Sequence, residues 1–488
     1  MDNLPEILFS EASATTRSRQ ILRLAESGRL RKIYAGVYTS NLEETLETIV
    51  RRNWHSIAGH LLPDAVLASR SGFDVAPHDG HLYLTRGRTR RTLDLPGLII
   101  DVIPGPAAVQ EGPAADQKFG GLFLPSEART FLENLARGKG VAERVLPQPE
   151  VERKLDQMLL LRGDSRLNQL RDQAREISKP LGKAREFERL DTLVGALLGT
   201  RAAKGLWSEQ ALARAAGRPY DPQCLQRFDV LFAALRRPFP FRPDPALTDQ
   251  GRENFAFLEA YFSNYIEGTT FLIAEAEAIV FQGAIISGRS ADSHDILGTY
   301  QAAMREPLRS QLPENDDAFL GWLKTLNRTV MERRAERLPG EWKDRANQAG
   351  STVFVAPELV VGTLRQGFQR ISALEDPFAR ALMTMFVITE IHPFLDGNGR
   401  TARLAMNAYL TAAGACRIII PTIYREDYLL PLKALSHNTE PEPFLRSMDR
   451  AQAWSAAFDY RDLPTVLATM SRCNAFQEDL RQYRLLFP

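Results

Sequence analysis

Cysteine is scarce in this sequence of 488 residues, which contains only Cys224, Cys416 and Cys473. Their wide separation offers no disulfide framework and no cysteine-based metal site, and such usage is typical of a reducing compartment. Long apolar runs are also missing, since no stretch reaches the roughly eighteen apolar residues that a membrane span requires. The first residues lack the basic and apolar regions of a signal peptide. We therefore expect a cytoplasmic protein without a membrane partner.

Net charge is nearly absent as well, because 61 lysines and arginines face 60 aspartates and glutamates, for a formal charge of +1. This balance excludes nucleic-acid binding by bulk charge, so any such role must be local. Internal repeats and low-complexity tracts are missing too. A hydrophobic content of 44% is ordinary for a globular protein, and the chain is long enough for two or three domains.

The most informative segment reads His-Pro-Phe-Leu-Asp-Gly-Asn-Gly-Arg-Thr-Ala-Arg, at residues 392–403. Apolar residues precede it at near-helical spacing and predict a buried helix over residues 377–391. Pro393 should end that helix, because the residue before a proline is pushed out of the helical region. A glycine-rich turn follows, and residues 400–411 are expected to form a second helix.

The turn that opens the second helix predicts an anion site. Gly397 and Gly399 permit positive φ values and a close backbone approach, so the N–H groups around Asn398 can converge at the positive end of the helix dipole. Arg400 and Arg403 lie three residues apart on the new helix and can face the same phosphates. The pattern therefore favours a phosphate-bearing ligand.

Two further side chains add chemistry to this site. Asp396 is a hard oxygen ligand, suited to one Mg²⁺ ion that keeps most of its waters. His392 can accept a proton at neutral pH. Taken singly, a histidine at a helix end is usually structural, and an aspartate beside glycine usually belongs to a turn. Together within twelve residues they indicate a phosphoryl or nucleotidyl transfer site.

The segment resembles the signature of the Fic family of AMP-transferring proteins, His-x-Phe-x-Asp-Gly-Asn-Gly-Arg-x-x-Arg, and every fixed position is present. The resemblance implies a protein adenylyltransferase: a serine, threonine or tyrosine hydroxyl of a target protein, or of the enzyme itself, attacks the α-phosphorus of ATP, and pyrophosphate leaves. The glycine-rich turn would cradle the phosphates. The other implied roles are base for His392, Mg²⁺ ligand for Asp396, β- and γ-phosphate contacts for Arg400 and Arg403, and a nucleotide contact for Asn407.

A second motif, Ser263 with Glu267 and Gly268, ends a predicted helix over residues 251–268. A carboxylate at a helix C-terminus is unfavourable unless a cation pairs with it, although an ordinary surface glutamate is the simpler interpretation. The spacing resembles the inhibitory-helix motif of one class of Fic proteins, [Ser/Thr]-x-x-x-Glu-[Gly/Asn]. That resemblance implies that Glu267 reaches Arg403 and blocks the γ-phosphate position, so that the enzyme is autoinhibited.

A lone β-rich patch at residues 350–357, among predicted helices, contains Thr352, Val353 and Phe354. The Fic resemblance implies a hairpin, or flap, that holds the target segment by strand addition. The alternative is a structural hairpin without a partner. The resemblance covers roughly residues 250–440.

The N-terminal residues 1–40 form a separate signal. We expect residues 7–9 to start a short helix, residues 13–16 to form a turn, and residues 17–27 to form a helix that ends at Gly28. A β-hairpin wing over residues 30–38 should follow. The segment resembles the winged-helix start of abortive-infection antitoxin regulators, with an α+β module after it.

The basic residues of this segment predict DNA contacts, in which phosphate-binding side chains position a helix. The expected DNA-binding residues are Arg17, Arg19, Arg23 and Arg31. A protein-contact module with a solvated basic face is the alternative. Strands are expected at residues 81–85 and 98–103, and a short helix at residues 65–69.

We therefore expect a mostly α protein, with a Fic-type helical bundle and a β-hairpin flap preceded by an α+β winged-helix module. The predicted domains are a winged helix-turn-helix (1–40), an antitoxin-like α+β module (41–148), a helical linker region (149–245), a Fic catalytic domain (246–445) and C-terminal helices (446–488). Expected partners are ATP, Mg²⁺, a target protein, DNA and a second copy of the chain. The alternative function is a DNA-binding regulator whose Fic domain is autoregulatory or removes AMP, and Fic folds can also transfer other phosphate-containing groups.

Overall fold

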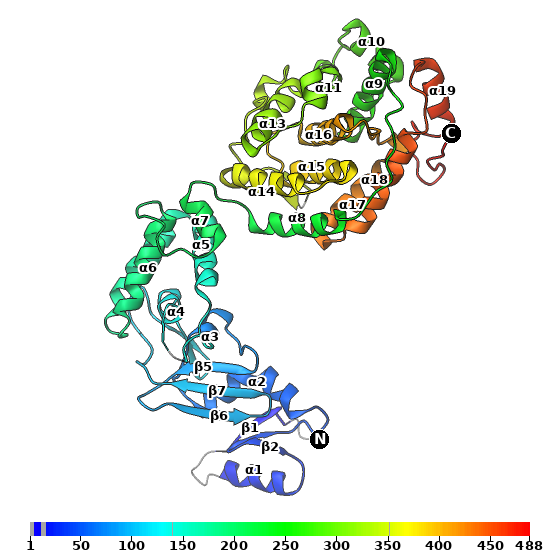
Figure 1. Ribbon diagram of the computed structural model, residues 1–488. Helices are drawn as coiled ribbons and strands as arrows, with labels where there is room; N and C mark the ends of the chain where they lie inside the picture. The colour runs from blue at the N-terminus through cyan, green and yellow to red at the C-terminus, as the bar shows by residue number, and fades with distance from the viewer. Residues whose placement is uncertain (1–3, 11–15, 139, 351) are drawn as a thin grey trace. The chain divides into compact units, whose positions relative to one another are not determined.

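The computed structural model describes residues 4–10, 16–138, 140–350 and 352–488. The chain divides into two compact units, residues 1–217 and 218–488 (Figure 1). The boundary lies inside the predicted helical region 149–245. The first three helices of this region belong to the first unit, and its last helix belongs to the second. In the described parts of the chain, no helix combines the length and apolar character that crossing a membrane requires.

The start of the first unit is a small antiparallel sheet with one helix. Strand β1 (Ile7–Phe9) pairs with β3 (Val37–Thr39), which also pairs with β2 (Arg31–Tyr34). The predicted short helix at residues 7–9 is therefore wrong, because pairing with β3 satisfies the backbone and buries Leu8.

Helix α1 (Thr16–Glu26) and the hairpin of β2 and β3 confirm the helix and the hairpin that the sequence predicts. Gly28 ends the helical segment with φ of 76°. The predicted turn at 13–16 lies mostly outside the described residues, which begin again at Thr16. Among the described residues up to 40 there is one helix, so the first helix of the predicted helix-turn-helix is not found there.

A six-stranded mixed sheet follows, in the order β6-β7-β5-β4-β9-β8. Its strands are β4 (Val66–Leu67), β5 (His81–Thr85), β6 (Arg91–Leu95), β7 (Leu98–Ile103), β8 (Gln117–Phe119) and β9 (Leu122–Leu124). The predicted strands at 81–85 and 98–103 are confirmed as β5 and β7, which run parallel. The predicted helix at 65–69 is wrong: β4 is fully buried between β5 and β9. Helix α2 (Leu46–Leu61) and the short α3 (Arg70–Asp74) pack against this sheet.

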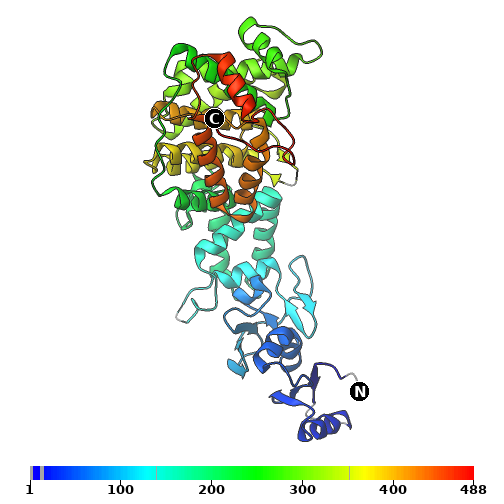
Figure 2. The same ribbon diagram turned by 90° about the vertical axis from the view of Figure 1, so that its right-hand side faces the viewer.

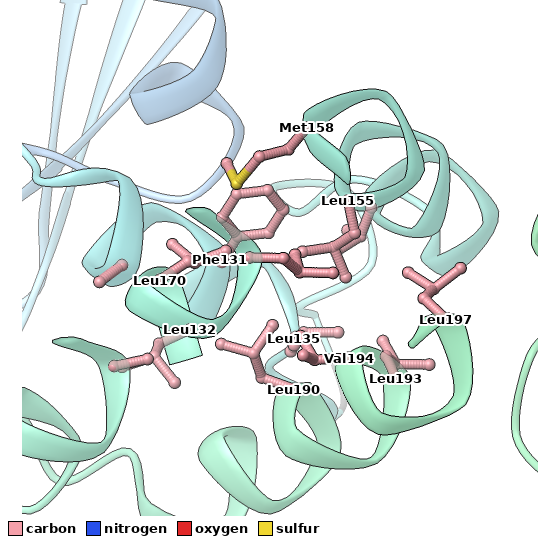
Figure 3. Packing of buried hydrophobic residues seen from close by; sticks show 14 of the residues in the cluster. Phe131, Leu132, Leu135, Leu155, Met158, Leu170, Leu190, Leu193, Val194 and Leu197 are labelled. Atoms are coloured by element: carbon pink, nitrogen blue, oxygen red, sulfur yellow. The ribbon is translucent and has the colours of Figure 1, made fainter. Parts of the chain in front are cut away.

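The rest of the first unit is helical, with α4 (Glu127–Asn134), α5 (Gln148–Ser178), α6 (Ala184–Leu197) and α7 (Glu209–Ala215). Leucine, phenylalanine and methionine side chains from α4, α5 and α6 interlock in one buried cluster (Figure 3). Gly163 interrupts α5 with φ of 73°.

The second unit is an assembly of helices, shown in green to red in Figures 1 and 2. Its helices are α8 (Pro222–Leu235), α9 (Asp249–Ile266), α10 (Ile273–Gln282), α11 (Ser290–Met304), α12 (Glu306–Ser310), α13 (Asp316–Val330), α14 (Val360–Ser372), α15 (Pro377–Ile391), α16 (Asn398–Ala412), α17 (Arg425–Asn438), α18 (Pro441–Ser455) and α19 (Leu463–Arg472). Helix α15 packs against α8, α14 and α16, and nearly all of its side chains are buried. It confirms the buried helix predicted at residues 377–391.

Candidate active site

The candidate site lies in the turn between α15 and α16. His392 follows α15 directly, in the left-handed region with φ of 54°, and its backbone N–H still donates to Ile388 at 2.9 Å. Gly397 precedes α16 with φ of 75°, and a Cβ there would come within 2.7 Å of the Met331 sulfur. Glycine is therefore required at 397 both by its conformation and by the lack of space.

Asn398 closes the turn with its side chain. Its Oδ1 accepts a hydrogen bond from the Phe394 N–H at 2.9 Å, and its Nδ2 donates to the Phe394 carbonyl at 2.8 Å. The Asn327 amide also donates to the Asp396 carbonyl at 3.0 Å. Because the Asn398 amide holds the turn, the group that it can offer to an anion is its backbone N–H at the start of α16.

Arg400 is 4% exposed and pairs with a residue that the sequence motifs did not include. Its Nη1 lies 2.8 Å from the Asp295 carboxylate of α11, and Arg334 contacts the same oxygen at 3.0 Å. Among the described residues, Nε of Arg400 finds no hydrogen-bond partner. The Asp295 carboxylate thus fixes the position of the Arg400 guanidinium, whose Nε–H remains available to donate. Asp295 gives no local signal, because it lies about a hundred residues before the turn in sequence.

Arg403 is held by the end of α9. Its Nε and Nη2 donate to the side chain and the carbonyl of Ser263, both at 2.9 Å, and Nη2 also donates to Glu267 at 2.6 Å. Burial alone would raise the pKa of the Glu267 carboxyl, but the Arg403 guanidinium holds that pKa below its ordinary value. Gly268 follows with φ of 94°.

The Glu267 carboxylate also lies against the glycine-rich turn. A Cβ at Gly399 would overlap the carboxylate oxygen and approach Arg403 to 3.1 Å. The side chain of Glu267 is nevertheless 35% exposed, so it borders the site rather than lying in the core. A negative charge therefore occupies the space in front of the N–H groups that open α16.

The imidazole of His392 is oriented by its own helix. Nδ1 lies 3.0 Å from the Thr389 carbonyl, which can only accept, so the proton belongs on Nδ1 and the lone pair on Nε2. Burial lowers the pKa of His392 to about 4, with the Lys343 ammonium acting in the same direction, while the Thr389 carbonyl, Glu267 and Asp396 oppose it. His392 is therefore neutral at pH 7 and able to accept a proton.

The predicted β-hairpin is confirmed as β10 (Gln348–Ala349) paired with β11 (Thr352–Val353). Val353 is 70% exposed, and the Thr352 hydroxyl lies 2.9 Å from Nε2 of His437. Phe354 follows β11 and stacks on the His392 imidazole, with ring centroids 3.7 Å apart and planes 6° from parallel. The hairpin thus covers one face of the imidazole.

Asp396, the predicted Mg²⁺ ligand, is partly exposed beside the turn. Its side chain is 34% exposed; Oδ1 accepts the Gly397 N–H at 2.6 Å, and Oδ2 lies 3.5 Å from Arg337. Across the described residues, no group of three or more histidine, cysteine, aspartate or glutamate side chains could hold a metal ion alone. One carboxylate fits Mg²⁺ only where substrate phosphates and waters supply the other ligands.

Asn407 does not lie with these side chains. Its amide donates to Glu259 at 2.8 Å and to the Ile418 carbonyl at 3.0 Å, and it accepts from the Ile418 N–H at 2.8 Å. Both ends of the amide are therefore engaged in the core, and the nucleotide contact stays a prediction that requires these bonds to be exchanged.

The four arginines predicted to bind DNA belong to the first unit, and the structure separates them into two kinds. Arg17, Arg19 and Arg23 are exposed on α1. Arg31 is partly buried, and its guanidinium donates to the Asn41 carbonyl at 2.8 and 3.1 Å. Arg31 therefore holds a loop and is not equivalent to the three arginines of α1.

Comparisons with known proteins match the part of the chain that contains the turn between α15 and α16. Residues 319–410 match the model of the Fic/DOC family, a span that includes the hairpin, α15 and most of α16 but not α9. Protein adenylyltransferase fic-1 of Caenorhabditis elegans is 30% identical over 206 residues, which are 41% of this chain and 40% of the relative. Protein adenylyltransferase Fic of Drosophila erecta is 31% identical over 196 residues, 39% of each chain.

This chain therefore spans about two-fifths of the length of the curated relatives that it matches. Among solved structures, "Fic-1 (aa134 - 508) from C. elegans" aligns over 66% of this chain and 97% of that one, with 19% identity and a TM-score of 0.37.

Proposed function

We propose that this protein transfers AMP from ATP to a hydroxyl side chain of a protein. One observation carries the proposal: a neutral histidine with its lone pair on Nε2 ends one buried helix, and a glycine-rich turn flanked by two buried arginines opens the next helix. The Fic/DOC match over the same residues and the adenylyltransferase names of the relatives support it.

The residues of the chain divide the work of such a transfer. His392 accepts the proton of the attacking hydroxyl as that oxygen bonds to the α-phosphorus, and the bond to the pyrophosphate oxygen breaks. The N–H groups of Asn398 and Gly399 and the Arg400 guanidinium face the phosphate charge, so the site acts mainly by positioning and charge neutralisation. Mg²⁺, when bound at Asp396, would neutralise further phosphate charge.

Glu267 restrains the reaction in this proposal. Its carboxylate competes with the γ-phosphate for Arg403 and repels phosphate charge beside Gly399. ATP could then bind only with its α-phosphate displaced from the line of attack. A displacement of about 1 Å can cost roughly 10²-fold in rate, so complete exclusion of ATP is not required.

The test is mass spectrometry of the purified protein, and of a cell lysate, after incubation with ATP and Mg²⁺. We expect AMP adducts on a serine, threonine or tyrosine with the Glu267→Gly variant and few with the wild type. If both proteins leave all hydroxyls unmodified while the variant binds ATP, AMP transfer is wrong. Loss of AMP from a modified protein would instead support the AMP-removing alternative.

A second candidate function concerns α1, whose three exposed arginines favour contact with a polyanion. We propose that this end of the chain binds duplex DNA, as its resemblance to a winged-helix regulator implies, and that the catalytic unit is then part of a regulator. Binding of the full chain to duplex DNA at several salt concentrations tests this. Cytoplasmic location and self-association stay predictions.

A further inference from the structure

The turn that carries His392 rests on a segment that the sequence motifs did not include, residues 342–347, between α13 and the hairpin. Lys343 is 2% exposed. Its backbone N–H donates to the Pro393 carbonyl at 2.9 Å, and its ammonium donates to the Ile391 carbonyl at 3.1 Å and to Asn347 at 2.7 Å. Burial lowers the pKa of Lys343 to about 8. A lysine is costly in such a place unless its donors are used, and here they hold the backbone on both sides of His392.

Asn347 holds the two remaining carbonyls of the same stretch. Its Nδ2 donates to the His392 carbonyl at 3.3 Å and to the Phe394 carbonyl at 2.9 Å. Together, Lys343 and Asn347 contact four consecutive carbonyls, from 391 to 394. His392 is in the left-handed region with φ of 54°. Residues other than glycine rarely adopt this conformation unless the surrounding structure holds them in it.

The same segment leads directly into the hairpin. Asn347 precedes β10, and its carbonyl accepts the Phe354 N–H at 3.2 Å after the hairpin returns. The Phe354 ring lies on the His392 imidazole, and the Lys343 ammonium lies 6.0 Å from the centre of that ring. One buried lysine and one asparagine therefore hold the backbone around His392, and the asparagine also holds the backbone of the residue whose ring covers the imidazole.

We infer that Lys343 and Asn347 are positioning residues for His392, which fix its backbone conformation and couple the imidazole to the hairpin. This inference rests on the proposed AMP transfer, in which His392 acts as the base. The hydrogen bonds of both residues reach residues 391–394 and not the N–H groups of residues 397–399, so substitutions should impair the chemical step more than nucleotide binding. A purely structural pair would instead change both together, along with the thermal stability.

The kinetic test uses the Glu267→Gly protein as background and varies ATP. Asn347→Asp keeps the size of the side chain but cannot donate, and Lys343→Met keeps the stem without the ammonium. We expect kcat to fall about 10- to 100-fold, the size of effect that a small misplacement produces, with KM for ATP changed less than about twofold. Lys183→Met, which removes a lysine from its ion pair with Glu186 in the first unit, is the matched control and should change neither. Should either variant unfold, Asn347→Ser, which keeps one donor, takes its place.

A second measurement needs no AMP transfer and so separates the two proposals. The His392 imidazole, assigned by its loss in His392→Gln, is titrated by NMR in each variant. Burial, the Lys343 ammonium, Glu267 and Asp396 all act on its pKa, and Lys343→Met should raise that pKa because a neighbouring cation is removed. An inactive Glu267→Gly background with the expected NMR shift would refute AMP transfer and keep the positioning role. An unshifted imidazole together with an unchanged kcat, or a kcat and KM that change in parallel with the melting temperature, would overturn the positioning role.

Discussion

Arg403 and Glu267 form an ion pair with 2.6 Å between Nη2 and Oε1, which joins α16 to the end of α9. Ser263 accepts two further hydrogen bonds from the same guanidinium. One short segment therefore engages Nε and Nη2 of the cation expected to meet the γ-phosphate, and the carboxylate lies against Gly399. In the proposed function, the nucleotide and Glu267 would compete for this guanidinium, and the first predictions follow from that competition.

Glu267→Gly should raise self-labelling with AMP by about 10²-fold over the wild type at saturating ATP, because it removes the carboxylate from the phosphate turn. The glycine costs about 1 kcal/mol or less, since position 267 lies just after the last turn of α9. Glu267→Gln keeps the size of the side chain and removes its charge, so its labelling rate should lie between those of the wild type and Glu267→Gly. If Glu267→Gly labels no faster than the wild type, Glu267 does not inhibit the reaction and is an ordinary residue at the end of a helix.

Arg403→Ala should not mimic Glu267→Gly, although it breaks the same ion pair. The change also removes the γ-phosphate contact, and it leaves the Glu267 carboxylate without its guanidinium. We expect weak ATP binding by calorimetry and little labelling, both in the single variant and in the double variant with Glu267→Gly. Labelling by the double variant at the rate of Glu267→Gly alone would show that Arg403 does not contact the nucleotide.

His392→Ala in the Glu267→Gly background should abolish AMP transfer, by about 10²–10⁴-fold, while ATP still binds. The reason is that the imidazole accepts a proton and contributes no phosphate contact in the proposed reaction. His60→Ala is the matched control, because His60 stacks on Phe9 in the first unit. Equal losses in the two variants would reject His392 as the base.

Protein stability should fall as the pH drops from about 6.5 to about 4, in part because of His392. Its folded-state pKa of about 4 lies below the ordinary 6.5, so the unfolded chain takes up the proton first and acid favours unfolding. Protonation of His392 lowers the free energy of unfolding by at most about 3 kcal/mol between these two pH values. Above about pH 6.5 the imidazole is neutral in both states, so this loss of stability is absent. Urea unfolding of wild type and His392→Gln at pH 4.5 and pH 7.5 checks this: the difference in unfolding free energy between the two pH values should be smaller in the variant.

DNA binding by the full chain, if carried by α1, should weaken steeply with salt. Replacing Arg17, Arg19 and Arg23 with glutamine should lower the slope of log affinity against log salt by about 0.9 for each phosphate contact removed. Glutamines at Arg153, Arg162 and Arg175, which are exposed on α5 of the first unit, provide the matched control. Fluorescence anisotropy with a labelled duplex measures both slopes. No binding at low salt would leave α1 as a protein-contact element.

The sequence by itself determined the parts of the site that depend on neighbouring residues. The apolar spacing of residues 377–391, Pro393 and the two glycines specify a buried helix, its end and a turn that opens a second helix, because helix ends and turns are governed by contacts within a few residues. Resemblance to a known signature added a role for Glu267 that spacing alone could not show. The structure agrees on the helix, the turn, the hairpin and the contact of Glu267 with Arg403.

Only the tertiary structure decided what lies around that turn. Asp295 beside Arg400, and Lys343 with Asn347 at the four carbonyls, come from other parts of the chain and have no local pattern. The β-rich patch that contains Phe354 was visible in the sequence, but its stacking on the His392 imidazole was not. The wrong predictions at residues 7–9 and 65–69 have the same cause, since both segments are strands only because distant strands supply their hydrogen-bond partners. Local spacing sets the backbone of a turn, whereas burial and pairing with distant segments set the charge, the tautomer and the position of the side chains that it carries.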